Sequence, residues 1–390
     1  MKSKLDTGSS IFTIMTELSN KHDAINLSQG FPGFNPDPRL LELVCKYIRS
    51  DNNQYAPMAG IPALQDCIAE KIKKFYGRTI DARQEVTICD GATEGLFSVI
   101  QAVVYPNDEV IVFDPAYDNY GPDIVLAGAI TRHVPLIRTK ERNDYHIDWQ
   151  KLKDTINEKT KLIILNFPHN PTGAILRSED LDTLADILRD TSIYIMSDEV
   201  YEHIVFDGKK HLSLASHDEL WLRSFVISSF GKTFHATGWK VGYCAAPIEL
   251  SKEMRQIHQW TCYSVVTPIQ HGLAEFMQTC PDYIDSLSSF YEAKRDYFCK
   301  LIESSKFSYQ VSAGSFYQLL DYSGISEEKD TSFAKKLTEE IGVASIPISV
   351  FYENPPFEQK LRFCFAKGLI LINPINSNIP PTTYLIFITS

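Results

Sequence analysis

The feature that most constrains this 390-residue sequence is a repeated order of short apolar run, loop and helical segment that begins at residue 86. Short apolar runs bounded by turn-forming residues are typical of buried strands, and strands that alternate with helices form parallel sheets with crossover helices. The pattern predicts strands at residues 86–89, 110–113, 161–166, 193–196 and 224–227. We therefore expect an α/β fold with a mostly parallel central sheet.

Each predicted strand leads into a loop of small, polar or aromatic residues. These loops are Asp90–Gly95, Asp114–Tyr117, Phe167–Gly173, Ser197–Tyr201 and Ser228–Lys232. Ligands of open parallel sheets bind at the carboxyl ends of the strands. The loops are therefore predicted to meet at one crevice.

The regions before and after this pattern differ from it. Residues 1 to about 25 indicate an arm with one short helix, and Gly/Pro-punctuated loops follow at 26–34 and 53–60. From about residue 281 a long charged helix precedes a second region, with strands expected at 309–311, 316–321, 343–347 and 361–365 and a helix at 333–341. We expect residues 1–40 to form the arm and part of a small domain, 41–285 a large domain, and 286–390 a small α+β domain.

Composition excludes several classes of partner. A formal net charge of −11, with no basic stripe, argues against nucleic acid or an anionic membrane as the main partner. The eight cysteines show no C-x-x-C pair and no metal-ligand spacing, which favours reduced thiols and no metal site. No signal-like segment and no run of about twenty apolar residues is present, so we expect a cytoplasmic protein whose ligand is small.

Lys232 is the first candidate for chemistry. It follows an apolar strand within a Ser-x-x-Lys turn, and this short connection to the strand fixes the position of the amine. A lysine in a partly desolvated pocket has a lowered pKa and can form a Schiff base with an aldehyde. The alternative is a surface lysine in a glycine-rich turn.

The other loops supply the parts that pyridoxal phosphate requires, namely an acid at the pyridine nitrogen, donors to the phenolate O3′, a phosphate cradle and an aromatic face. Asp198 ends a strand and suits the pyridine nitrogen, whereas Asn170 and Tyr201 could reach O3′. Tyr117 offers an aromatic ring. Separately, Asp198 could cap a helix, Asn170 could form an ordinary turn and Tyr117 could be core.

The small residues at 91–95 begin a helix, where open backbone N–H groups suit a phosphate. A simple helix cap by Asp90 or Thr93 is the alternative. Gly30 either allows a close backbone approach or forms a plain turn.

Seven motifs carry a family resemblance: LSQGFP at 27–32, NQY at 53–55, GATE at 91–94, HNPTG at 169–173, SDEVY at 197–201, SFGKT at 229–233 and LRFCFAK at 361–367. Through them the chain resembles the fold-type I, class I/II aminotransferases that depend on pyridoxal 5′-phosphate. Within that family it is similar to the bacterial methionine aminotransferases and the kynurenine aminotransferase (glutamine transaminase K) group. The similarity spans residues 5 to 367.

The resemblance implies a role for each matching position. The catalytic residues would be Lys232 (Schiff base and proton shuttle), Asp198 and Tyr201. The cofactor would also contact Ala92, Thr93, Tyr117, Asn170, Ser229 and Lys240, and Tyr55 would reach the phosphate of the neighbouring subunit of a homodimer. The substrate would contact Gly30, Asn170, Arg362 and Phe12, with Arg362 gripping the α-carboxylate. Many relatives have arginine where this chain has Lys240, and a lysine neutralises phosphate without a bidentate fork.

Substrate choice follows from apolar positions expected around the side chain: Phe12, Ile11, Val265 and Val266. Such a pocket suits methionine and aromatic amino acids, because a second carboxylate would be buried without a partner. The predicted reaction is ping-pong transfer of that amino group to a 2-oxo acid. The alternatives are cysteine-S-conjugate β-lyase or kynurenine aminotransferase activity at the same site, or a fold that only binds the cofactor.

The C-terminal tail departs from the family pattern. Relatives usually continue into a charged amphipathic helix, whereas residues 368–390 contain no charged residue. Pro374, Pro380 and Pro381 also forbid a long helix there.

Overall fold

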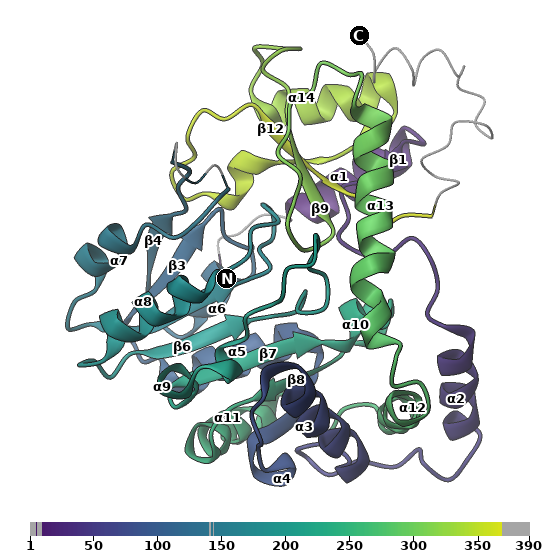
Figure 1. The fold of residues 1–390 in the computed structure, drawn as a ribbon, viewed down its shortest axis with the longest axis vertical. Helices are drawn as coiled ribbons and strands as arrows, with labels where there is room; N and C mark the ends of the chain where they lie inside the picture. Colours follow the sequence, from purple (N-terminus) through teal and green to yellow (C-terminus); the bar gives the residue numbers. More distant parts are fainter. Residues whose placement is uncertain (1–4, 6–9, 140–141, 143, 369–390) are drawn as a thin grey trace.

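The computed structural model describes residues 5, 10–139, 142 and 144–368 (Figure 1). The atypical tail thus lies outside the described residues from position 369 onward. The α-helices are α1 (Ile11–Lys21), α2 (Pro38–Ile48), α3 (Pro62–Tyr76), α4 (Ala82–Glu85), α5 (Gly91–Val103), α6 (Tyr120–Leu126), α7 (Trp149–Thr155), α8 (Ser178–Leu188), α9 (Asp218–Trp221), α10 (Phe230–Thr233), α11 (Ile248–Thr261), α12 (Thr267–Thr279), α13 (Leu287–Ile302) and α14 (Asp330–Lys336).

The strands are β1 (Ile25–Asn26), β2 (Val86–Asp90), β3 (Glu109–Asp114), β4 (Ile130–Pro135), β5 (Thr160–Asn166), β6 (Tyr194–Asp198), β7 (Ser224–Ser229), β8 (Val241–Ala245), β9 (Tyr317–Asp321), β10 (Val343–Ala344), β11 (Ile346–Pro347) and β12 (Lys360–Cys364). Short 3₁₀ segments are η1 (Leu214–Ser216), η2 (Thr237–Trp239), η3 (Ile284–Ser286) and η5 (Ile348–Phe351), and η4 (Leu337–Ile341) is a π-helical turn.

The central sheet has seven strands in the order β2-β8-β7-β6-β5-β3-β4. Strand β8 runs antiparallel to both of its neighbours, whereas the pairs from β7 to β4 are parallel. The predicted α/β fold with a mostly parallel sheet is therefore confirmed. Strands β4 and β8 were not anticipated, because the motif residues around Lys240 obscured β8 and the burial of β4 alternates with exposure.

Successive residues of the central strands face opposite sides of the sheet. On β5, Ile163 joins the core cluster that includes α8, whereas Leu162 and Ile164 join the cluster that includes α5 and α11. Both faces are thus covered by helices (Figure 1). Burial on both faces explains why these strands read as continuous apolar runs in the sequence.

Local sequence signals set the ends of the flanking helices. Helix α3 begins at Pro62, whose missing N–H costs nothing in the first turn. It ends at Gly77, which adopts a left-handed conformation with φ of +76°. These two signals set the ends of the helix.

The small domain packs beside the carboxyl ends of the central strands. Its three-stranded antiparallel sheet has the order β11-β12-β9, and the long helix α13 connects it to the large domain (Figure 1). Strand β1 pairs in parallel with β10, so the N-terminal segment contributes to this domain. The domain boundaries at 40/41 and 285/286 stay predictions.

The expected elements of the small domain needed correction. Residues 309–311 form no strand; only the neighbouring Ser308 makes a bridge, to Asp321. The single strand expected at 343–347 is two short strands, because β10 pairs with β1 and β11 pairs with β12. The helix expected at 333–341 begins at Asp330 and its last turn is π-helical.

In the described part of the chain, no helix combines the length and apolar character needed to cross a membrane. The eight cysteines all belong to that part and all are free.

Candidate functional site

A cavity of about 300 Å³ opens where the loops of the central sheet meet the small domain and the N-terminal segment. Its walls include Phe12, Gly30, Phe31, Gly91, Ala92, Thr93, Tyr117, Asn166, Asn170, Asp198, Tyr201, Ser229, Lys232, Lys240 and Tyr317. The predicted convergence of the loops on one crevice is confirmed, because residues from all five loops line this cavity.

Lys232 lies on the single-turn helix α10, directly after β7. Its Nζ atom donates to the carbonyl oxygen of Gly30 at 2.8 Å and lies 5.7 Å from the centre of the Tyr201 ring. Burial lowers the pKa of this amine to about 8, because an ammonium group is poorly solvated there. The alternative of a surface lysine is therefore excluded.

Asp198 ends β6 and is 4% exposed. Its Oδ2 atom accepts a 2.7 Å hydrogen bond from the Tyr120 hydroxyl. Burial raises the pKa of Asp198 to about 6, and the hydrogen bond from Tyr120 opposes that rise. Asp198 does not cap a helix, since the next helical segment begins only at Leu214. The Val200 backbone N–H also donates to its Oδ1 atom, at 3.4 Å. A buried carboxylate with only neutral donors is suited to a cationic ligand group.

Asn166 and Asn170 join the loops after β5 and β6. The Asn166 side chain accepts from the Asn170 backbone N–H and donates to the Asp198 carbonyl, both at 3.0 Å. This leaves the Asn170 side chain free to meet the small domain, where its Oδ1 atom accepts from Arg362 at 2.8 Å. Asn170 is therefore more than a turn residue.

Arg362 on β12 is fully buried, at 0% exposure. It also donates to the Ser28 carbonyl at 2.7 Å, and its Nε atom has no partner among the described residues. No carboxylate of the described chain forms an ion pair with it, and aromatic rings of Phe12, Tyr317 and Phe351 surround the guanidinium. A buried cation without a counter-ion is costly, so this arrangement favours an anionic ligand.

The N-terminus of α5 forms an open cradle. No side chain caps it, so neither Asp90 nor Thr93 fills the role of a simple cap. Gly91 has φ of +68°, and a Cβ atom there would lie 3.1 Å from the Lys240 Nζ atom. Free N–H groups, the helix dipole and a lysine together fit a phosphate.

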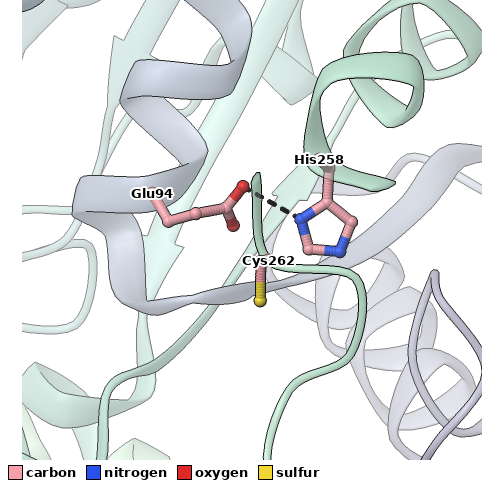
Figure 2. A group of neighbouring side chains, drawn as sticks. All are labelled: Glu94, His258 and Cys262. Carbon is pink, nitrogen blue, oxygen red and sulfur yellow. Dashed lines mark hydrogen bonds and ion pairs between the residues drawn. The ribbon is translucent and has the colours of Figure 1, made fainter. Parts of the chain in front are cut away.

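Behind this cradle lies a cluster of Glu94, His258 and Cys262 (Figure 2). The His258 ring contacts Glu94 Oε1 through Nδ1 at 2.9 Å and the Met58 carbonyl through Nε2 at 3.0 Å. These two contacts connect α11 to α5 and to the loop that carries Tyr55.

The ligand atoms of Glu94, His258 and Cys262 lie within 4.8 Å of one another, and in the described residues this is the one such group of three. Both Glu94 oxygens already accept hydrogen bonds, from Ser98 and from the Asp90 backbone as well as from His258. Hydrogen bonding accounts for the geometry, and the absence of a metal site stays a prediction.

Some expected residues lie outside the cavity. Tyr55 is 82% exposed and packs its ring edge-on against Tyr263. Ile11, Val265 and Val266 do not line the cavity, so the expectation that they form its walls is wrong for this chain by itself. Phe12 does line it.

Three residues at the site were missed. Asn166 could have been found, because it is a polar residue at the carboxyl end of a parallel strand, as Asp198 is. Tyr120 and Tyr317 carry no comparable signal, since a tyrosine in a helix or strand is ordinarily core.

The mixed seven-stranded sheet, the half-buried lysine and the buried carboxylate at its edge, the open helix N-terminus and an arginine with no ion-pair partner in the described residues together define a fold-type I pyridoxal-phosphate enzyme. The donor set fits this cofactor: the cradle suits its phosphate, Asp198 its pyridinium and Lys232 its aldehyde.

The chain belongs to the aminotransferase class I and II family, whose model matches residues 22–369. It is therefore a pyridoxal-phosphate-dependent aminotransferase. It is 42% identical to the methionine aminotransferase of Escherichia coli K12 over 360 residues, which cover 92% of each chain. It is 35% identical to human kynurenine–oxoglutarate transaminase 3 over 386 residues, or 92% of this chain and 85% of the relative.

Solved structures of related proteins have the same fold as this chain. An Escherichia coli protein identified as having a methionine aminotransferase function superposes with a TM-score of 0.90 at 40% identity, covering 100% of this chain and 98% of that one. The N-succinyldiaminopimelate aminotransferase of Mycobacterium tuberculosis gives 0.91 at 32% identity, with 95% and 97% covered.

Proposed function

We propose that this enzyme transfers the amino group of methionine or an aromatic amino acid to a 2-oxo acid by a ping-pong mechanism. The observation that carries this proposal is the buried guanidinium of Arg362, which lies among aromatic rings and has no ion-pair partner among the described residues. An α-carboxylate would supply the missing counter-ion. The surrounding rings favour an apolar side chain and leave a second carboxylate without a partner.

The relatives support the same substrate class. One is a methionine aminotransferase and another a kynurenine–oxoglutarate transaminase, so both sulfur-containing and aromatic donors occur among similar proteins. Discrimination between such donors rests on pocket shape and is worth only about 10- to 200-fold per methylene group.

We assign the cofactor contacts by the chemistry of each group. Asp198 would face the pyridine nitrogen, Asn170 and Tyr201 would meet O3′, and Tyr117 would lie against the ring. The phosphate would be held by Ala92, Thr93, Ser229 and Lys240. When bound, the cofactor supplies an electron sink for the negative charge that develops at the substrate Cα atom.

Lys232 would both hold the cofactor and move the proton. An amine whose pKa is about 8 is partly unprotonated near neutral pH, so its Nζ atom can accept the α-proton of the substrate. Arg362, Asn170 and the Gly30 segment would orient the substrate so that this proton faces Lys232. The small cavity limits the water that competes for it.

The enzyme is further proposed to act as a homodimer. Tyr55 is largely exposed, and its loop is held by hydrogen bonds that the Gln54, Ala56 and Met58 carbonyls accept from Thr267, Ser264 and His258. A firmly held loop with an exposed tyrosine suits a contact with a second subunit. Mixing inactive Tyr55→Phe and Lys232→Ala subunits should restore one functional site per mixed dimer, which an active-site titration would measure.

The proposed reaction is tested by adding L-methionine to the purified holoenzyme without any 2-oxo acid. Conversion of the Schiff-base absorption to that of the pyridoxamine form is expected with methionine and phenylalanine, and not with aspartate. Lys232→Ala is the control and should not convert. Release of pyruvate and ammonia from a cysteine S-conjugate, with no half-reaction on methionine, would contradict the proposal and indicate a β-lyase.

A further inference from the structure

We infer that Tyr317 is a positioning residue. It contacts both Arg362, the proposed partner of the substrate carboxylate, and the Tyr201 hydroxyl, and it orients that hydroxyl toward the cofactor. The inference rests on the proposed function, because it takes Tyr201 as a donor to O3′. It assigns a role to a residue that carries no recognisable sequence signal.

The placement of Tyr317 is set by the small-domain sheet. It is the first residue of β9, pairs with Cys364 on β12 and is 3% exposed. The ring therefore projects from the small domain into the cavity, whose wall it forms together with residues of the large domain.

The first contact of Tyr317 is with Arg362. The guanidinium carbon lies 4.1 Å from the centre of the Tyr317 ring, closer than to the rings of Phe12 at 5.1 Å or Phe351 at 5.4 Å. A desolvated guanidinium is attracted to the face of such a ring. The Tyr317 ring thus packs against the guanidinium group of Arg362.

The second contact is with Tyr201. The two hydroxyl oxygens are 3.0 Å apart, and each hydroxyl has a single hydrogen to donate. Burial raises the pKa of Tyr317 to about 12 and holds that of Tyr201 well above its ordinary value, so both keep their hydrogens at neutral pH. If Tyr201 donates to O3′, Tyr317 must be the donor between the two. Accepting that bond also makes Tyr201 a stronger donor.

The third contact is with the backbone that holds the lysine. A Cβ atom on Gly30 would lie 1.8 Å from the Tyr317 hydroxyl oxygen, so only glycine allows this approach. The Gly30 carbonyl in turn accepts from Lys232. The Tyr317 side chain therefore contacts Arg362, which is proposed to bind the substrate carboxylate, and Tyr201, which is proposed to donate to O3′. It also contacts Gly30, whose carbonyl accepts from Lys232.

Tyr317→Phe tests the inference, because it keeps the ring under Arg362 and removes only the hydroxyl. The readout is the pH titration of the Schiff-base absorption of the holoenzyme, which needs no substrate. Weaker donation to O3′ leaves more negative charge beside the Schiff-base nitrogen, so its pKa should rise by about 0.5 to 1 unit. Tyr201→Phe should raise it at least as much, and the double variant no further.

The matched control is Tyr291→Phe. The Tyr291 hydroxyl is buried nearby and has no partner among the described residues, so its removal should leave the titration unchanged. In steady-state assays Tyr317→Phe should lower kcat about three- to tenfold with KM within twofold, whereas Tyr317→Leu should also raise KM about tenfold.

A shift in Tyr201→Phe without one in Tyr317→Phe overturns the inference. No shift in either variant overturns the proposed contact of Tyr201 with O3′, and the inference with it. Failure of methionine to react would affect only the proposed substrate, because the titration is made without substrate.

Discussion

The Nη1 atom of Arg362 donates a 2.8 Å hydrogen bond to the Oδ1 atom of Asn170, which joins β12 of the small domain to the loop after β5 of the large domain. Because Asn170 is also a proposed cofactor contact, this bond spans the substrate and cofactor halves of the cavity. The proper spacing of the two halves thus depends on packing between the domains.

Arg362→Lys keeps the positive charge and loses the planar fork that meets Asn170 and Ser28. We expect kcat/KM for methionine to fall about 10- to 100-fold, mostly through KM, because each lost charged hydrogen bond costs about 1.5 to 3 kcal/mol. Steady-state kinetics measure this. The absorption spectrum of the bound cofactor should stay unchanged, and an unchanged KM would contradict the role of Arg362.

Asp198→Asn should lower kcat about 100-fold or more, because a neutral amide cannot stabilise a protonated pyridine nitrogen. Tyr120→Phe should have a smaller effect of about tenfold, since it removes one hydrogen bond from a carboxylate that remains. The two effects should not add in the double variant, because Tyr120 acts through Asp198. Additive losses would show that Tyr120 acts elsewhere.

Lys232 makes the stability of the apoprotein depend on pH. Its pKa is about 8 when folded and near 10.5 when unfolded, so between these values the unfolded chain binds more protons and stability rises with pH. The non-titrating variant Lys232→Met should therefore exceed wild type in free energy of unfolding by about 2 kcal/mol near pH 7. The difference should shrink by pH 10. Urea unfolding at a series of pH values measures it, with Lys252→Met, a surface change, as control.

Lys240→Ala should weaken binding of pyridoxal phosphate to the apoprotein about 10- to 100-fold, whereas Lys240→Arg should preserve it. The reason is the position of the Lys240 amine beside Gly91 at the open end of α5. Titration with pyridoxal, which lacks the phosphate, is the control and should give equal affinities. A loss of pyridoxal binding in Lys240→Ala would indicate disturbed folding instead.

His258→Ala should lower the free energy of unfolding by about 3 kcal/mol, because the Met58 carbonyl loses its donor and the Glu94 carboxylate keeps only those of Ser98 and the Asp90 backbone. Cys262→Ser is the matched control and should cost less than about 1 kcal/mol. Chemical denaturation of the apoprotein measures both. An equal loss in Cys262→Ser, with zinc present in the purified protein, would instead indicate a metal site.

Much of the site was predictable from local pattern. Lys232, Asp198 and Asn170 all follow apolar runs that read as buried strands, and the carboxyl ends of parallel strands must meet at one edge of a sheet. Tyr117 and the residues at 91–93 followed from the same rule. The strand β8 did not, because its residues directly follow the motif around Lys240, which obscured them.

The sequence by itself determined the fold class, the edge of the sheet that carries the chemistry and the residues that project from it, because strand order and periodicity are local properties of the chain. Only the tertiary structure decided that Arg362 is buried with no counter-ion in the described part of the chain, that Tyr120 donates to Asp198 and that Tyr317 bridges Arg362 and Tyr201. These contacts join residues 45 or more positions apart through side-chain burial and hydrogen bonding. Neither property exists until the chain has folded, and the contact between Tyr201 and Tyr317 also requires the two domains to pack against each other.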